Sequence, residues 1–241
     1  MGHARLNLRK IAMTSTSPAY TVSDLHTDAS SGLRYRVRLP VPAQIARCVV
    51  LLHGVGSNEI HMADVATGVD AQTLVIFAQG PLQLGPQQFA WFRVAFTASG
   101  PSIVPEEAQS SRKALIAFVQ SLQTQYSVQP EQTVIAGFSQ GGIMSASVGL
   151  SAPQQVSGFA ILSGRILPEL APYIADKDAL QKLRVLVAHG EHDSKLPVMW
   201  AQRSDQWLTE LGVQHTVKLY PIDHTISAAM HTDFLAWLSA A

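Results

Sequence analysis

The sequence has 241 residues, 47% of them hydrophobic, and its 17 acidic side chains balance its 17 basic ones. A chain of this length can bury one large core, and balanced charge argues against nucleic acid or an anionic membrane surface as a partner. We therefore expect a single domain over residues 20–241 that acts on a neutral small molecule, as a monomer or homodimer.

The first 19 residues differ from the rest of the chain. Three basic residues are followed by only a short apolar stretch at 11–13 and then by a polar run, which is too short for a signal peptide. We expect residues 1–19 to be a disordered extension. The lone Cys48 cannot form an internal disulfide, which favours a reducing compartment and a cytoplasmic location. No other apolar run is long enough to span a bilayer.

Strand-like apolar runs alternate with helix-like segments from residue 20 onward. This alternation predicts an α/β fold with a mainly parallel sheet covered by helices on both faces. The first two strands, near residues 20–25 and 34–39, should pair antiparallel at one edge. Further strands are predicted at 47–52, 133–136, 184–188 and 216–220, and helices at 62–69, 106–126, 140–150, 176–183, 198–211 and 226–239.

The predicted strand at 47–52 is apolar throughout, as expected for a parallel strand buried on both faces. It ends in a loop that contains His53, Gly54, Val55 and Gly56. Two glycines allow the backbone to approach a ligand closely, so the amide of Val55 could face a substrate oxygen. A plain turn between strand and helix is the alternative.

The segment 79–105 is rich in proline, glycine and glutamine, and it holds Phe89, Trp91, Phe92 and Phe96. Loops of this length without regular structure are uncommon and often serve as lids or binding loops. We expect this loop to form a wall of the substrate site, with Trp91 and Phe92 in contact with substrate. Anchoring of the loop to the core is the alternative.

The stretch 133–142 reads TVIAGFSQGG, in which a β-branched strand leads into G-x-S-x-G and then into a helix of small residues. This context is typical of a nucleophile elbow, so Ser139 is the candidate nucleophile. Gly137 and Gly141 flank the serine where the turn is too sharp for a side chain. The amide of Gln140 begins the helix and points toward the place where a substrate oxygen would become negative.

A serine nucleophile needs a base and a group that orients the base, and these follow in the order serine, acid, histidine. The predicted strand at 184–188 runs into a loop with Glu191, His192 and Asp193. Asp193 is the preferred acid, and Glu191 is the alternative. The next strand ends before His224, the candidate base.

Nine histidines are present, but only His224 has the expected order and loop. His53 and His189 precede a glycine at a strand end, where histidine commonly bonds to the backbone. His189 with His192 is the nearest approach to a metal site, but no third ligand follows at suitable spacing. We expect neither a metal nor a cofactor.

Taken in order, these motifs resemble the phospholipase/carboxylesterase family of α/β-hydrolases, which includes bacterial carboxylesterases and acyl-protein thioesterases. The resemblance covers residues 20–240 and includes the segments His53–Gly56, Trp91–Phe92, Gly137–Gly142, Leu162–Arg165, His189–Asp193 and His224. It implies an α/β-hydrolase fold without a separate cap domain. It also implies a catalytic triad of Ser139, Asp193 and His224, an oxyanion hole of the Val55 and Gln140 amides, and Trp91 in the acyl-binding wall.

The sequence departs from the thioesterases of that family at three places. Val-Gly-Ser-Asn follows His53-Gly54 where Leu-Gly-Asp is usual, Thr225 follows His224 where an acidic residue is common, and Arg93 follows Trp91-Phe92. We therefore predict a serine esterase for carboxylic esters of small to medium acyl chain. A long-chain acyl-protein thioesterase or lysophospholipase is the alternative, and a catalytically silent binding protein is the alternative of another class.

Overall fold

The computed structural model describes residues 20–97 and 100–240. The predicted extension at 1–19 lies outside these residues. Within them, a nine-stranded sheet has the order β1-β3-β5-β4-β10-β11-β12-β13, with β2 beside β3. The strands are β1 (Thr21–Val22), β2 (His26–Thr27), β3 (Arg34–Leu39), β4 (Arg47–Leu52), β5 (Thr73–Gln79), β10 (Thr133–Phe138), β11 (Gly158–Leu162), β12 (Arg184–Gly190) and β13 (Gln214–Tyr220).

The six strands from β5 to β13 in this order are parallel, and β3 joins their edge antiparallel to β5. The predicted antiparallel edge is therefore present, although only β1 falls within the first predicted strand, and β2, just after its predicted end, also pairs with β3. Parallel strands align their carboxyl ends, so the loops after β4, β10, β11, β12 and β13 open at one edge of the sheet.

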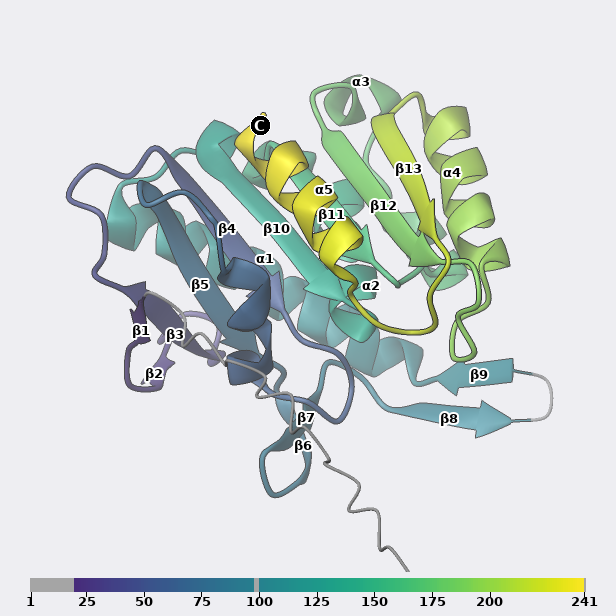
Figure 1. Ribbon diagram of the computed structural model, residues 1–241, viewed down its shortest axis with the longest axis horizontal. Coiled ribbons are helices and arrows are strands. Elements are labelled where there is room, and N and C mark those ends of the chain that lie inside the picture. The colour runs from purple at the N-terminus through teal and green to yellow at the C-terminus, as the bar shows by residue number, and fades with distance from the viewer. Residues whose placement is uncertain (1–19, 98–99, 241) are drawn as a thin grey trace, which may run out of the picture.

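Helices cover both faces of the sheet, as predicted (Figure 1). Along β4, Val50 and Leu52 pack with one cluster, whereas Val49 and Leu51 pack with the other, because successive side chains of a strand point to opposite faces. The first cluster includes residues of α1 (Pro105–Tyr126), α2 (Gln140–Ser151) and α4 (Met199–Leu211). The second includes residues of α5 (Ala228–Ser239) and of two short 3₁₀ helices, η1 (Glu59–Met62) and η2 (Asp64–Ala66).

Two predicted helices are shorter than expected. The segment 62–69 forms no continuous helix: η1 and η2 meet at Ala63, and Gly68 follows with a φ of +83° that ends helical geometry. In the segment 176–183, α3 (Lys177–Leu180) makes a single turn. No helix within the described residues is long and apolar enough to cross a membrane.

The segment 79–105 is not the structureless loop that we predicted. It contains two antiparallel hairpins, β6 (Leu82–Gly85) with β7 (Gln88–Ala90), and β8 (Val94–Thr97) with β9 (Gly100–Ile103). Figure 1 shows both beyond the carboxyl end of the central sheet. Their strands are too short for apolar alternation to stand out in the sequence. The turn of the first hairpin places Gln87, not a glycine, at a φ of +57°.

Candidate active site

Ser139 lies in a tight turn between β10 and α2, with φ 54° and ψ −117°. Only close backbone packing holds a non-glycine residue in such a conformation. A Cβ on Gly137 would lie 2.3 Å from the carbonyl carbon of Gly141, and a Cβ on Gly141 would lie 2.1 Å from the carbonyl oxygen of Leu52. A side chain at either glycine of G-x-S-x-G would therefore collide with the neighbouring backbone.

We expect Gly141→Ala to destabilise the protein by about 1–3 kcal/mol, because the new methyl group would displace the backbone of β4. For a chain of this size the loss corresponds to a decrease in Tm of roughly 2–4 °C per kcal/mol, measurable by calorimetry. Gly85→Ala in β6 is the matched control, because its Cβ would approach only the flexible side chain of Gln88, at 3.1 Å. An unchanged Tm in Gly141→Ala would contradict this packing argument.

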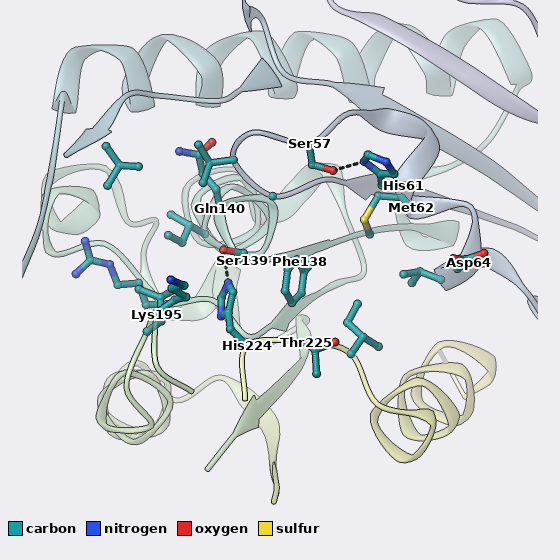
Figure 2. A pocket seen from close by; sticks show the side chains of 18 of the residues that line it. Ser57, His61, Met62, Asp64, Phe138, Ser139, Gln140, Lys195, His224 and Thr225 are labelled. Atoms are coloured by element: carbon teal, nitrogen blue, oxygen red, sulfur yellow. Dashed lines mark hydrogen bonds between the residues drawn. The ribbon is translucent and has the colours of Figure 1, made fainter. Parts of the chain in front are cut away.

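A chain of hydrogen bonds joins Ser139, His224 and Asp193. The Oγ of Ser139 lies 2.9 Å from His224 Nε2 (Figure 2), and His224 Nδ1 lies 2.7 Å from Asp193 Oδ2. An ionised carboxylate only accepts hydrogen bonds, so Nδ1 carries the proton of the neutral imidazole. Nε2 is then left to accept the proton of the Ser139 hydroxyl. The structure thus brings together the three residues that the sequence predicted for this role.

Asp193 is buried, and backbone donors surround its carboxylate. Its Oδ1 accepts hydrogen bonds from the amides of Lys195 and Leu196 at 2.9 and 2.7 Å, which leaves Oδ2 to face His224. Glu191, the alternative acid, is exposed, and so is His192. The neighbouring carboxylate of Asp223 accepts the amides of His224 and Ser194, which fixes the loop that carries the histidine.

The two predicted oxyanion donors flank Ser139. Val55 and Gln140 both line the pocket that contains the serine. Gln140 is the first residue of α2, so its N–H has no acceptor within the helix. Its side chain accepts a hydrogen bond from the Trp91 amide and donates one to the Phe92 carbonyl, both at 2.7 Å. These hydrogen bonds between α2 and the segment 79–105 were not predicted.

Trp91 and Phe92 are both buried, but only Phe92 lines the pocket. The indole of Trp91 points to the loop after β4 and donates a hydrogen bond of 3.0 Å to the His53 carbonyl. Trp91 thus supports the loop that carries Val55 from behind, in line with the anchoring alternative. Phe89 is also buried, and the side chain of Phe96 lies outside the described part of the chain.

His53 is buried in the same loop and is held by two backbone groups. Its Nδ1 lies 2.7 Å from the Gly54 carbonyl oxygen, and its Nε2 accepts the Gly80 amide at 2.9 Å. Desolvation by burial lowers the pKa of His53 from 6.5 to about 4. His189 is also fully buried, and desolvation lowers its pKa too. Both histidines are therefore neutral at physiological pH.

We expect acid to destabilise the protein through His53. Because its folded-state pKa lies below the unfolded value, the unfolded chain binds more protons between pH 6.5 and 4. The stabilisation is complete above about pH 6.5 and falls by about 3 kcal/mol as the pH reaches 4. Urea unfolding across this range should show that slope, and His53→Gln should reduce it. His26→Gln, at an exposed strand position, is the control, and equal slopes in both variants would refute the assignment.

The pocket around Ser139 has a volume of about 750 Å³. Several lining residues were not predicted as part of the site: the apolar side chains Met62, Ile103, Ile143 and Ile226, and the charged side chains Arg165 and Lys195. Figure 2 shows Lys195 on one side of Ser139, and Met62 and Asp64 on the other. Arg165 ends the Leu162–Arg165 motif, and Lys195 lies two residues after Asp193. In the sequence, their place in pocket-lining loops is indicated by these neighbouring motif residues alone.

The sequence also matches a known protein family. Residues 42–240 match the profile of the family described as Phospholipase/Carboxylesterase. The chain belongs to this family. It is accordingly a serine hydrolase of the carboxylesterase type, with the α/β-hydrolase fold that the sequence predicted.

Relatives within the phospholipase/carboxylesterase family carry two kinds of name. Acyl-protein thioesterase 1 of Kluyveromyces lactis is 28% identical over 178 residues, which cover 68% of this chain and 77% of that protein. Carboxylesterase SOBER1 of Arabidopsis thaliana is 33% identical over 100 residues, 41% of this chain and 43% of that one. The crystal structure of a carboxylesterase from Mesorhizobium loti has a TM-score of 0.77 at 19% identity and covers 91% of this chain and all of that one, which shows the shared fold.

Proposed function

We propose that this protein hydrolyses carboxylic esters of small to medium acyl chain through a Ser139–His224–Asp193 triad. The observation that carries the proposal is the position of His224, whose two ring nitrogens lie within hydrogen-bond distance of Ser139 Oγ and Asp193 Oδ2. A hydroxyl is a weak nucleophile unless such a base removes its proton. Family membership supports the same class of reaction.

In the proposed mechanism, Ser139 Oγ attacks the ester carbonyl while His224 Nε2 takes its proton. Asp193 keeps the proton on Nδ1 and stabilises the imidazolium that forms. The imidazolium then protonates the leaving alcohol, and an acyl-enzyme results. Water repeats the sequence on the acyl-enzyme and releases the acid, which regenerates the free serine.

Stabilisation of the tetrahedral intermediate is assigned to the amides of Val55 and Gln140. Among the described residues, no protein acceptor is bonded to the Val55 amide. The Gln140 amide adds the partial positive charge of a helix N-terminus. Preorganised donors of this kind contribute roughly 3–4 kcal/mol each to transition-state stabilisation. The side-chain bonds of Gln140 to the Trp91 and Phe92 backbones support this preorganisation.

The acyl wall is assigned to Phe92, which lines the pocket, with Trp91 behind it as support. Each methylene group that the wall can accommodate contributes about 0.8 kcal/mol of burial, so specificity should rise with chain length until the wall is reached. The departures from thioesterase motifs noted above favour esters over long-chain thioesters. The names of the Kluyveromyces and other fungal relatives keep a thioesterase as the second candidate.

We expect kcat/KM on nitrophenyl esters to rise from acetate toward butyrate or hexanoate and to fall at longer chains. A matched thioester series, measured as initial rates under the same conditions, should be slower at every length. A preference for palmitoyl substrates, or for thioesters throughout, would favour the second candidate. No turnover of any substrate would favour a silent binding protein, against which the complete hydrogen-bonded chain argues.

We further propose a cytoplasmic enzyme that requires no cofactor. The reducing compartment is inferred from the lone cysteine of the sequence, Cys48. This residue is buried in β4, and burial raises the pKa of its thiol to about 12. Such a thiol is neither a nucleophile nor available for a disulfide. The proposed partner is a small-molecule ester, with no role for nucleic acid.

A further inference from the structure

Arg165 is a charged group in the wall of the active-site pocket that the mechanism above does not use. It lies in the loop after β11 and is only 6% exposed. The residue before it, Gly164, packs against the nucleophile, since a Cβ there would lie 2.9 Å from the Ser139 carbonyl oxygen. The backbone of this loop is thus fixed directly beside Ser139.

The guanidinium of Arg165 forms no ion pair with any of the described residues. Among the described residues, no carboxylate lies within ion-pair distance of it, it donates no hydrogen bond, and its Nε is buried without any partner. Glu169 exerts an electrostatic attraction on it, but that side chain is exposed and forms no ion pair with it. A buried cation without a partner is costly, so proteins seldom keep one without a use.

Arg38 shows how this fold treats a comparable arginine. It is 8% exposed, and its guanidinium donates hydrogen bonds of 2.6–2.8 Å to the carbonyls of Val69, Asp70 and Thr73. Among the residues that the structure describes, Arg165 has no such bond. Its Nε is covered, and the residue lines the pocket around Ser139.

Trp200 holds the Arg165 guanidinium in place. The guanidinium carbon lies 4.3 Å from the centre of the Trp200 ring, which is the geometry of a cation–π contact. Stacking on a ring restricts the plane of the group and leaves its edge to meet a ligand.

Lys195 adds a second cation to the pocket lining. It follows the acid loop after β12, the strand adjacent to β11, and its backbone amide is bonded to Asp193. In Figure 2 the Lys195 side chain lies on the opposite side of Ser139 from Asp64.

We propose that Arg165 and Lys195 form a subsite for a carboxylate carried by the ester substrate. This inference rests on the proposed esterase function and names its substrate class as esters with a free acid group. The two terminal nitrogens of a guanidinium match the two oxygens of a carboxylate, and a lysine adds a flexible second charge. The neutral substrate expected from the overall charge balance is thereby replaced by an anionic one.

The test compares pairs of esters that differ only in charge. On the acyl side, nitrophenyl hemisuccinate is paired with the nitrophenyl ester of monomethyl succinate. On the alcohol side, 4-carboxyphenyl butyrate is paired with its methyl ester. We expect the wild-type enzyme to prefer the charged member in one of the two pairs, and the preferred pair shows which side of the scissile bond carries the carboxylate.

The variants are Arg165→Gln, Arg165→Lys and Lys195→Gln. Charged hydrogen bonds contribute about 1.5–3 kcal/mol, so Arg165→Gln should lower the ratio of kcat/KM for the charged over the neutral ester by roughly 10- to 100-fold. Arg165→Lys should retain part of the preference. Lys195→Gln, at an exposed position, should lower the ratio by a few fold. Arg203→Gln is the matched control, because exposed Arg203 stacks on the same Trp200 ring at 4.8 Å but does not line the pocket.

Each result has one interpretation. An equal loss on charged and neutral esters in Arg165→Gln would make Arg165 a structural residue and overturn the subsite. Wild-type preference for the neutral member of both pairs would overturn it as well, even if Arg165→Gln failed to fold. Hydrolysis of neutral esters without charge preference contradicts only this inference, whereas no hydrolysis of any ester contradicts the proposed function itself.

Discussion

Ser139→Ala should lower the turnover of a nitrophenyl ester by roughly 10⁴-fold or more while the fold stays intact. The alanine removes the hydroxyl that lies 2.9 Å from His224 Nε2, and members of such a triad act as a unit. The neighbouring backbone remains in place, because Gly137 and Gly141 pack on main-chain atoms and not on the serine hydroxyl. Residual activity above that of water would come from the oxyanion amides and from binding.

The measurement is kcat on the preferred ester, with circular dichroism to check the fold. An organophosphate should label Ser139 in the wild type, identified by peptide mass, and should leave Ser139→Ala unlabelled. Ser151→Ala, at the far end of α2, is the control and should keep its activity. Retention of most activity in Ser139→Ala would exclude Ser139 as the nucleophile.

Asp193→Asn should cost on the order of 10⁴-fold in kcat, the second large effect that we expect. An asparagine amide can donate to His224 Nδ1, which would move the ring proton to Nε2. The nitrogen that lies 2.9 Å from Ser139 Oγ could then no longer accept the hydroxyl proton. The carbonyl oxygen of asparagine can still accept the amides of Lys195 and Leu196, so the loop should keep its structure.

Glu191→Gln is the matched control for the acid, because it removes one carboxylate two residues away on the same loop. Glu191 is exposed, whereas Asp193 is buried against His224, so the control should lose little activity. Both variants are compared by kcat and by pH profile on one ester. If the two results were exchanged, the role of the acid would pass to Glu191.

The sequence alone predicted the turn at Ser139 and the two later strands whose loops carry Asp193 and His224. The elbow is local: the clash distances at Gly137 and Gly141 arise within a few residues and against one neighbouring strand, so G-x-S-x-G after a β-branched strand already specifies the turn. His224 and Asp193 could be chosen because parallel strands place their carboxyl ends at a common edge. That rule needs only the strands and their order along the chain.

Only the tertiary structure decided what each side chain faces. Trp91 and Phe92 are adjacent in sequence and both aromatic. The Trp91 indole nevertheless donates a hydrogen bond to the His53 carbonyl, whereas Phe92 lines the pocket. The two hairpins between β5 and α1 depend on turns and on neighbours distant in sequence, which strands of three or four residues do not reveal. Arg165 ends a predicted motif, but the absence of a hydrogen bond or ion pair to it from the described residues is a property of its surroundings. Residue type and order determine which chemistry is available, whereas burial and pairing across distant elements determine which groups are exposed to the substrate.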